Sequence, residues 1–239
     1  MSARRIRAIV RKEFREYRRH GSVVVATAIF PLIFLIQPLV VVFLEPAASA
    51  HLVEGWHILL YMLAIPVLAP SVLAAYAVAG ERQQGSLEPV LTTPIPREEF
   101  LLGKAISALI PSVGIAYVVY VFFLACVALF AQPEVAAAIL GLPDIALQIV
   151  FTPLLAGWSI WVGIAISTRA SDVRVAQQVT LLASLPLVIV TSLLAFDVIH
   201  ATLRLAIGAG AILIVADVLG WRVVSPMFDR ERLTTGNRG

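Results

Sequence analysis

The chain has 239 residues, of which 60% are hydrophobic and 14% are charged, and its mean hydropathy is +0.93. A soluble domain of this length carries about 25% charged residues, so the composition excludes an ordinary soluble protein. At about 20 apolar residues per span, we expect one membrane domain over residues 1–239 with about six helices. The net charge of +3 does not indicate a nucleic-acid partner, because eight of the eighteen basic residues lie within the first nineteen positions.

Residues 4–20 are predicted to form an amphipathic helix that lies in the membrane interface. Its apolar residues recur at helical spacing on one face, and basic residues occupy the other faces. A basic helix with an apolar stripe binds at the boundary between lipid headgroups and acyl chains. Membrane lipids are therefore expected partners, and the alternative is a positively charged cytoplasmic tail.

Six membrane-spanning helices are expected from the apolar segments that follow. Their predicted ranges are 22–44, 56–79, 104–131, 145–167, 175–196 and 203–223. Prolines interrupt several of these ranges, and membrane spans tolerate prolines because neighbouring helices can satisfy the freed backbone groups.

The basic residues indicate how these spans are oriented. The N-terminal segment, the loop at 80–104, the turn at 169–174 and the C-terminal tail hold seventeen of the eighteen lysines and arginines. Only Arg204 lies on the other side. The positive-inside rule places the basic segments in the cytoplasm, so we expect a multi-pass protein of the plasma membrane with both termini cytoplasmic.

The loop between the second and third spans has the character of a surface that a soluble partner binds. A glycine permits a sharp change of direction, and the serine after it can cap a short helix. Two leucines four residues apart form an apolar knob on this helix, two glutamates offer anionic contacts, and a proline ends it. The residues expected to contact the partner are Glu81, Gly85, Leu87, Glu88, Leu91 and Pro94. The alternative is a solvated connector with ordinary turn residues.

The same loop carries an ordered series of residues that resembles the signature of a known family. The series is Glu81, Arg82, Gly85, Ser86, Leu87, Glu88, Leu91, Pro94, Ile95, Phe100, Gly103 and Lys104. With the basic N-terminal helix, the six spans and the closing sequence at 228–231, it is similar to the ABC type-2 permease family. Two departures are mild: the family often has an acidic residue in place of Gln83 and a threonine in place of Ser86.

The resemblance implies the transmembrane subunit of an ATP-driven exporter. Such a subunit pairs with a second permease subunit, as a homodimer or a heterodimer, and docks a separate ABC ATPase subunit on a cytoplasmic coupling helix. ATP and Mg are then bound by the ATPase, and no cofactor is expected in this chain. The expected fold is an all-α membrane protein with six transmembrane helices, an N-terminal amphipathic interfacial helix and a cytoplasmic coupling helix between spans two and three.

The sequence carries no motif for binding ATP or for the catalytic chemistries with clear signatures. Gly103 and Lys104 do not belong to a P-loop, because Glu98 occupies the place of the upstream glycine. Neither H-E-x-x-H nor G-x-S-x-G occurs. The chain is therefore not expected to be an enzyme, and its energy source is expected to be a partner.

Asp217 and Gln37 are the candidate functional residues within the spans. Asp217 lies inside an apolar run, and such carboxylates usually face the interior of a helix bundle. A structural role and a role in transport or gating both remain open for it. Gln37, between Pro31 and Pro38, could line a path, although interhelical hydrogen bonding is the commoner use of such residues. The rival functions are an ion-coupled carrier with Asp217 as its coupling site and a non-transporting membrane scaffold.

Overall fold

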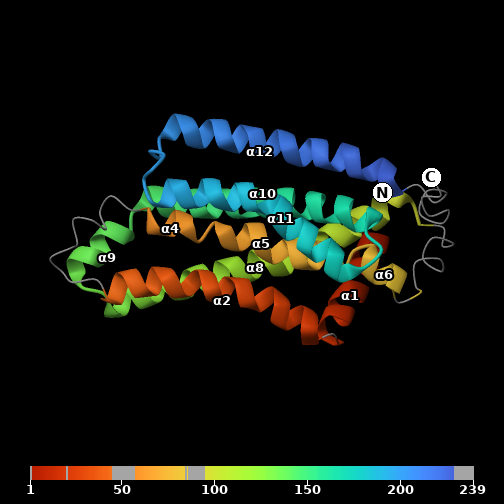
Figure 1. Cartoon of the computed structure of the whole chain (residues 1–239), viewed down its shortest axis with the longest axis horizontal. Helices are drawn as coiled ribbons and strands as arrows, with labels where there is room; N and C mark the ends of the chain where they lie inside the picture. The colour runs from red at the N-terminus through yellow and green to blue at the C-terminus, as the bar shows by residue number, and fades with distance from the viewer. Residues whose placement is uncertain (1, 20, 45–56, 84, 86–94, 229–239) are drawn as a thin grey trace.

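The computed structural model describes residues 2–19, 21–44, 57–83, 85 and 95–228, and every regular element in these ranges is helical (Figure 1). The first helices are α1 (Ala3–Arg19), α2 (Gly21–Leu44), α4 (Ile58–Tyr61), α5 (Ala64–Ala75) and α6 (Ala79–Gln83). They are followed by α8 (Arg97–Phe130), α9 (Pro133–Ile139), α10 (Leu142–Arg169), α11 (Val173–Ala195), α12 (Leu203–Val224) and the 3-10 turn η2 (Ser225–Phe228). The all-α prediction is confirmed for these residues.

Several of these helices are long and apolar enough to cross a membrane. Among the described residues there are five such stretches: Ile58–Gln83, Arg97–Phe130, Leu142–Arg169, Val173–Ala195 and Leu203–Met227. α2 contains a shorter apolar stretch, Thr27–Phe43. The chain is therefore a multi-pass membrane protein, while a sixth span over residues 22–44 stays a prediction.

The second predicted span, over residues 56–79, is interrupted in the structure and lies at the centre of the bundle. α4, α5 and α6 follow one another with turns between them, and 94% of the most apolar window is buried. Pro66 has no N–H to donate to the carbonyl of Met62, which favours the break before α5. α5 is apolar on all sides and packs against α2, α8, α10 and α11, as expected of a helix without a polar face.

α12 lies along one outer edge of the bundle, next to α10 (Figure 1). Only 6% of its apolar window is buried. Its exposed side chains include Ile207, Ile212, Val215 and Leu219. An apolar surface of this extent needs lipid or another subunit around it.

The start of α8, together with α1, α6 and η2, lies at one end of the bundle, and α9 lies at the opposite end (Figure 1). At the first end, one core cluster joins Ile9 of α1, Leu101 of α8, Ile164 of α10 and Val224 of α12. Segments far apart in the sequence therefore meet where the loop at 80–104 leaves and re-enters the bundle.

Candidate functional site

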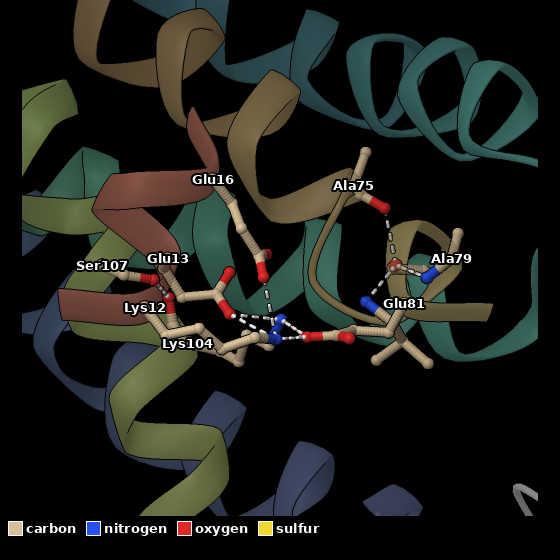
Figure 2. Close-up of polar contacts among 10 residues, drawn as sticks. Lys12, Glu13, Glu16, Ala75, Ala79, Glu81, Lys104 and Ser107 are labelled. Atoms are coloured by element: carbon tan, nitrogen blue, oxygen red, sulfur yellow. Dashed lines mark hydrogen bonds and ion pairs between the residues drawn. The ribbon is translucent and has the colours of Figure 1, made fainter. Parts of the chain in front are cut away.

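A cluster of charged side chains connects α1, α6 and α8 at this end of the bundle. Figure 2 shows its five members, which we call the charge cluster: Lys12, Glu13, Glu16, Glu81 and Lys104. Lys104 Nζ lies 2.8 Å from Glu13 Oε1 and 2.7 Å from Glu81 Oε1. Lys12 Nζ lies 2.5 Å from the same Glu81 oxygen and 3.2 Å from Glu16 Oε1. Two lysines thus share the carboxylates of two helices.

The cluster is deeply buried at its centre. The exposed fraction is 2% for Lys104 and 3% for both Glu13 and Glu81. Charges in such surroundings are tolerated when they are paired, and the Lys104 ammonium also lies 5.5 Å from the centre of the Phe100 ring, within the range of a cation–π contact. Loss of Lys104 would leave the two buried carboxylates to share Lys12, whose Nζ lies 2.5 Å from Glu81 Oε1 and 3.6 Å from Glu13 Oε1.

Lys12 lies at the rim of the charge cluster, with 40% of its side chain exposed. Burial and the nearby Lys104 charge lower the pKa of Lys12, but the hydrogen bond and charge of Glu81, with the charge of Glu13, outweigh them. The pKa of Lys12 is therefore raised above its ordinary value of 10.5. Lys12 keeps its positive charge across the physiological pH range.

Glu81 and Lys104 are the first and last residues of the sequence motif, so their ion pair ties together the two ends of the loop. Gly85 follows α6 with a φ of +67°, a left-handed conformation that glycine adopts at no steric cost. The remaining predicted coupling residues, Leu87, Glu88, Leu91 and Pro94, lie outside the described residues.

Arg82, the second residue of the motif, fastens α6 to the end of α10. Its Nη1 donates to the carbonyl of Ala170 at 2.6 Å, and its Nη2 donates to the carbonyl of Thr168 at 3.2 Å. The last carbonyls of a helix have no intrahelical partner, and a basic side chain can satisfy them. Arg82 therefore caps α10 from the neighbouring helix.

Ser167 of α10 stabilises the break between α5 and α6. Its buried hydroxyl donates to the carbonyl of Ala75 at 2.7 Å and accepts from the N–H groups of Val78 at 3.1 Å and Ala79 at 2.9 Å. Figure 2 labels Ala75 and Ala79, the two alanines of this contact. These backbone groups lie where the second span is interrupted, and buried backbone groups require partners. One serine thus fixes the direction in which α6 leaves the bundle.

Gly103 allows α1 to lie directly on α8. A Cβ atom at this position would be 2.7 Å from Ile9 Cγ2 and 2.9 Å from Ile9 Cβ, closer than side chains can approach. A second ion pair holds the start of α1, because Arg5 Nε lies 2.9 Å from Glu99 Oε2. α1 is thus packed on α8 along its length, and its predicted placement in the membrane interface stays a prediction.

The structure places Glu81 inside the bundle, whereas the sequence alone led us to expect a contact with a partner. Sequence reasoning missed Lys12, Glu13 and Ser167. A signal for Glu13 was present, because it falls four residues after Ile9 on the apolar face of the N-terminal helix, and a carboxylate there requires a counter-charge. Ser167, a single serine at the end of the predicted span 145–167, gave no comparable signal.

The two intramembrane candidates lie on different helices. Asp217 of α12 is half-buried, and its Oδ1 has no hydrogen-bond partner among the described residues. A Cβ atom at Gly157 of α10 would lie 2.9 Å from both carboxylate oxygens, so this carboxylate packs against a glycine. Gln37 is half-buried in α2, and nothing described connects it with Asp217.

The fold and this site define a multi-pass membrane protein whose charged loop is tied to the helix bundle at both of its ends. A family model described as ABC-2 family transporter protein matches residues 7–227. The chain therefore belongs to the ABC-2 transporter family, and the resemblance seen in the sequence is confirmed. In this family the permease is a membrane transport component that is not itself catalytic. A comparison with curated proteins finds no match.

Proposed function

We propose that the chain is the transmembrane subunit of an ABC exporter in the plasma membrane. It pairs with a second permease subunit and is driven by a separate ABC ATPase subunit, which binds ATP and Mg. Family membership and the apolar helices support a permease. The observation that carries the proposal is the buried ion pair between Glu81 and Lys104, because it links the charged loop to the helices that cross the membrane.

The ATPase docks on the segment between the tied ends of this loop. Leu87 and Leu91 form the apolar knob, Glu88 provides a charged contact, and Pro94 ends the helix that carries them. The left-handed φ of Gly85 sets the direction in which this segment leaves α6. An interface helix of this size concentrates its binding energy in a few anchor residues.

Movement of the docked segment reaches the spans through the residues at its base. When ATP binding closes the ATPase pair, displacement of the loop pulls on Glu81, which passes it to α8 through Lys104 and to α1 through Lys12. Arg82 passes the same displacement to the end of α10. Because Glu81 is buried, it acts as an anchor of the loop and not as a contact with the ATPase.

An ion-coupled carrier is the second candidate function. The observation that favours it is the Asp217 carboxylate oxygen, which lacks a hydrogen-bond partner among the described residues. An ion-coupled carrier needs no ATPase, so the co-purification of an ABC ATPase subunit distinguishes the two candidate functions.

The proposal is tested by co-expressing the tagged chain with its ABC ATPase and measuring the ATPase that co-purifies. Leu87→Asp should abolish co-purification, because it places a charge in an apolar cleft, which costs several kcal/mol. Glu88→Lys should weaken binding, and added salt should partly mask the defect. Gly85→Val should misdirect the segment, while Gly85→Asn, which tolerates a positive φ, serves as its control.

Membrane insertion of each variant is checked separately by its abundance in the membrane fraction. If the three damaging variants insert and bind the ATPase like the parent, the coupling proposal is wrong, and the ion-coupled carrier becomes the leading function.

A further inference from the structure

α1 carries a basic groove whose lining residues do not belong to the charge cluster. The groove has a volume of about 480 Å³, and the described residues that line it are Arg11, Phe14, Arg15, Arg18 and Arg19. The four arginines are exposed, and their spacing of three, four and seven residues places them on one side of the helix.

The carboxylates of α1 do not neutralise this groove. Glu13 is bound to Lys104 and Glu16 to Lys12, on the side of α1 that packs against the bundle. Within the described part of the chain, none of the four groove arginines forms an ion pair. Like charges three and four residues apart destabilise a helix, so a bound anion would stabilise this face of α1.

The position of the groove indicates which anion it binds. α1 ends at Arg19 and α2 begins at Gly21, with its apolar stretch starting at Thr27. The groove therefore lies close to the point where the chain enters an apolar phase. Phe14 places an aromatic ring among the guanidinium groups, which suits a ligand with a charged and an apolar part.

We infer that this groove binds the phosphate of an anionic phospholipid headgroup, with Phe14 against the adjoining glycerol and acyl region. Guanidinium groups form paired, charge-assisted hydrogen bonds with phosphate oxygens. A bound lipid would hold α1 in the interface while its opposite face holds Lys12 and Glu13 in the charge cluster. This inference does not depend on ATPase docking.

The test measures binding of the purified full chain to short-chain phosphatidylglycerol by native mass spectrometry and by the shift in thermal unfolding. Phosphatidylcholine and inorganic phosphate are the comparison ligands. Hydrogen bonds to a charged group are among the stronger ones in proteins, so Arg11→Gln/Arg15→Gln, which removes two guanidinium groups from the phosphate site, should weaken phosphatidylglycerol binding by roughly tenfold or more. The matched control is Arg4→Gln/Arg7→Gln, which removes the same charge from exposed residues of α1 outside the groove.

Arg11→Lys/Arg15→Lys separates a phosphate site from diffuse attraction, because it keeps the charge and removes the forked donors. The inference predicts that this variant binds phosphatidylglycerol several-fold more weakly than the parent and that the control variant binds normally. Equal weakening in the control variant, or parent-like binding by the lysine variant, would overturn it. An equal thermal shift with inorganic phosphate would identify a free anion as the ligand. Loss of ATPase co-purification in the glutamine variant, with lipid binding intact, would assign the groove to a protein partner.

Discussion

At the scale of single residues, the sequence motif has three physical roles. Its terminal members, Glu81 and Lys104, form a buried ion pair, and Gly103 removes the side chain that would keep Ile9 away from α8. These roles explain why Gly103 and Lys104 are adjacent in the sequence although they do not form a nucleotide-binding site. Arg82 adds hydrogen bonds to carbonyls at the end of α10.

Lys104→Met should destabilise the protein strongly. The substitution leaves the buried Glu13 and Glu81 with Lys12, which is 40% exposed, as their shared counter-charge, and breaking a buried ion pair by removing one partner costs about 3–5 kcal/mol. Thermal unfolding in detergent measures this loss. Lys12→Met is the control, with a smaller expected loss because Lys12 is 40% exposed and Glu81 keeps Lys104. Equal unfolding temperatures for the parent and Lys104→Met would contradict the account of the charge cluster.

Asp217→Asn should change function only modestly. The carboxylate packs against Gly157 without a hydrogen-bond partner in the described structure, and the amide has nearly the same shape. We expect normal insertion and a reduction of less than a few-fold in ATP hydrolysis coupled to transport, measured in the reconstituted complex. Complete loss of that activity in a folded, ATPase-bound variant would show that Asp217 has a functional role.

At the scale of elements, the important packing is that of α1 on α8 and of the broken second span on α10. The amphipathic pattern predicts a helix over residues 4–20, and α1 occupies Ala3–Arg19. The pattern does not reveal which helix α1 packs on, because an apolar stripe fits many surfaces. That partner is selected by Gly103 and by two ion pairs, Arg5 with Glu99 and Glu13 with Lys104, whose members lie far apart in the sequence.

The apolar runs of the sequence predict where the helices lie but not how they are arranged. The last predicted span, 203–223, begins at the first residue of α12 and ends one residue before its last. The break between α5 and α6 was not predicted, because Ser167, which stabilises it, lies 88 residues after Ala79 in the chain. The buried role of Glu81 was equally hidden, since a charged residue next to a glycine usually indicates an exposed turn.

Gly103→Val should detach α1 from α8. The new side chain would begin 2.7 Å from Ile9 Cγ2, and neither backbone can yield without breaking the neighbouring ion pairs. Limited proteolysis within α1 should become faster in this variant. Gly114→Val in the same helix is the control, because nothing lies within 4 Å of a Cβ atom there. Similar cleavage rates for the two variants would argue against close packing of α1 at Gly103.

At the scale of the whole molecule, the helices form a bundle with α1, α6 and η2 at one end (Figure 1). From the positive-inside rule we predict that this end faces the cytoplasm, where the proposed ATPase would bind the charged loop. The exposed apolar faces of α12 and α11 are available to lipid or to a second subunit.

The predicted orientation can be checked by cysteine labelling of intact cells. In a background with Cys126→Ala, Ala50→Cys and Ala138→Cys should react with an impermeant reagent added from outside. Ser86→Cys should react only after the membrane is opened, since the loop at 80–104 is expected to be cytoplasmic. Strong labelling of position 86 from outside would show that the predicted topology is wrong.

The central claim is that the residues at the base of the loop transmit force between a docked ATPase and the spans. Its most direct test is the rate of ATP hydrolysis by the reconstituted complex that carries Lys12→Gln, measured together with the amount of bound ATPase. Arg4→Gln, at an exposed position on the same helix, is the matched control. The account predicts that Lys12→Gln binds the ATPase normally but loses a measurable part of the stimulation that the parent permease gives to hydrolysis, because Lys104 and Arg82 still connect the loop to α8 and α10, while Arg4→Gln keeps all of it. Parent-like stimulation by Lys12→Gln would contradict the claim.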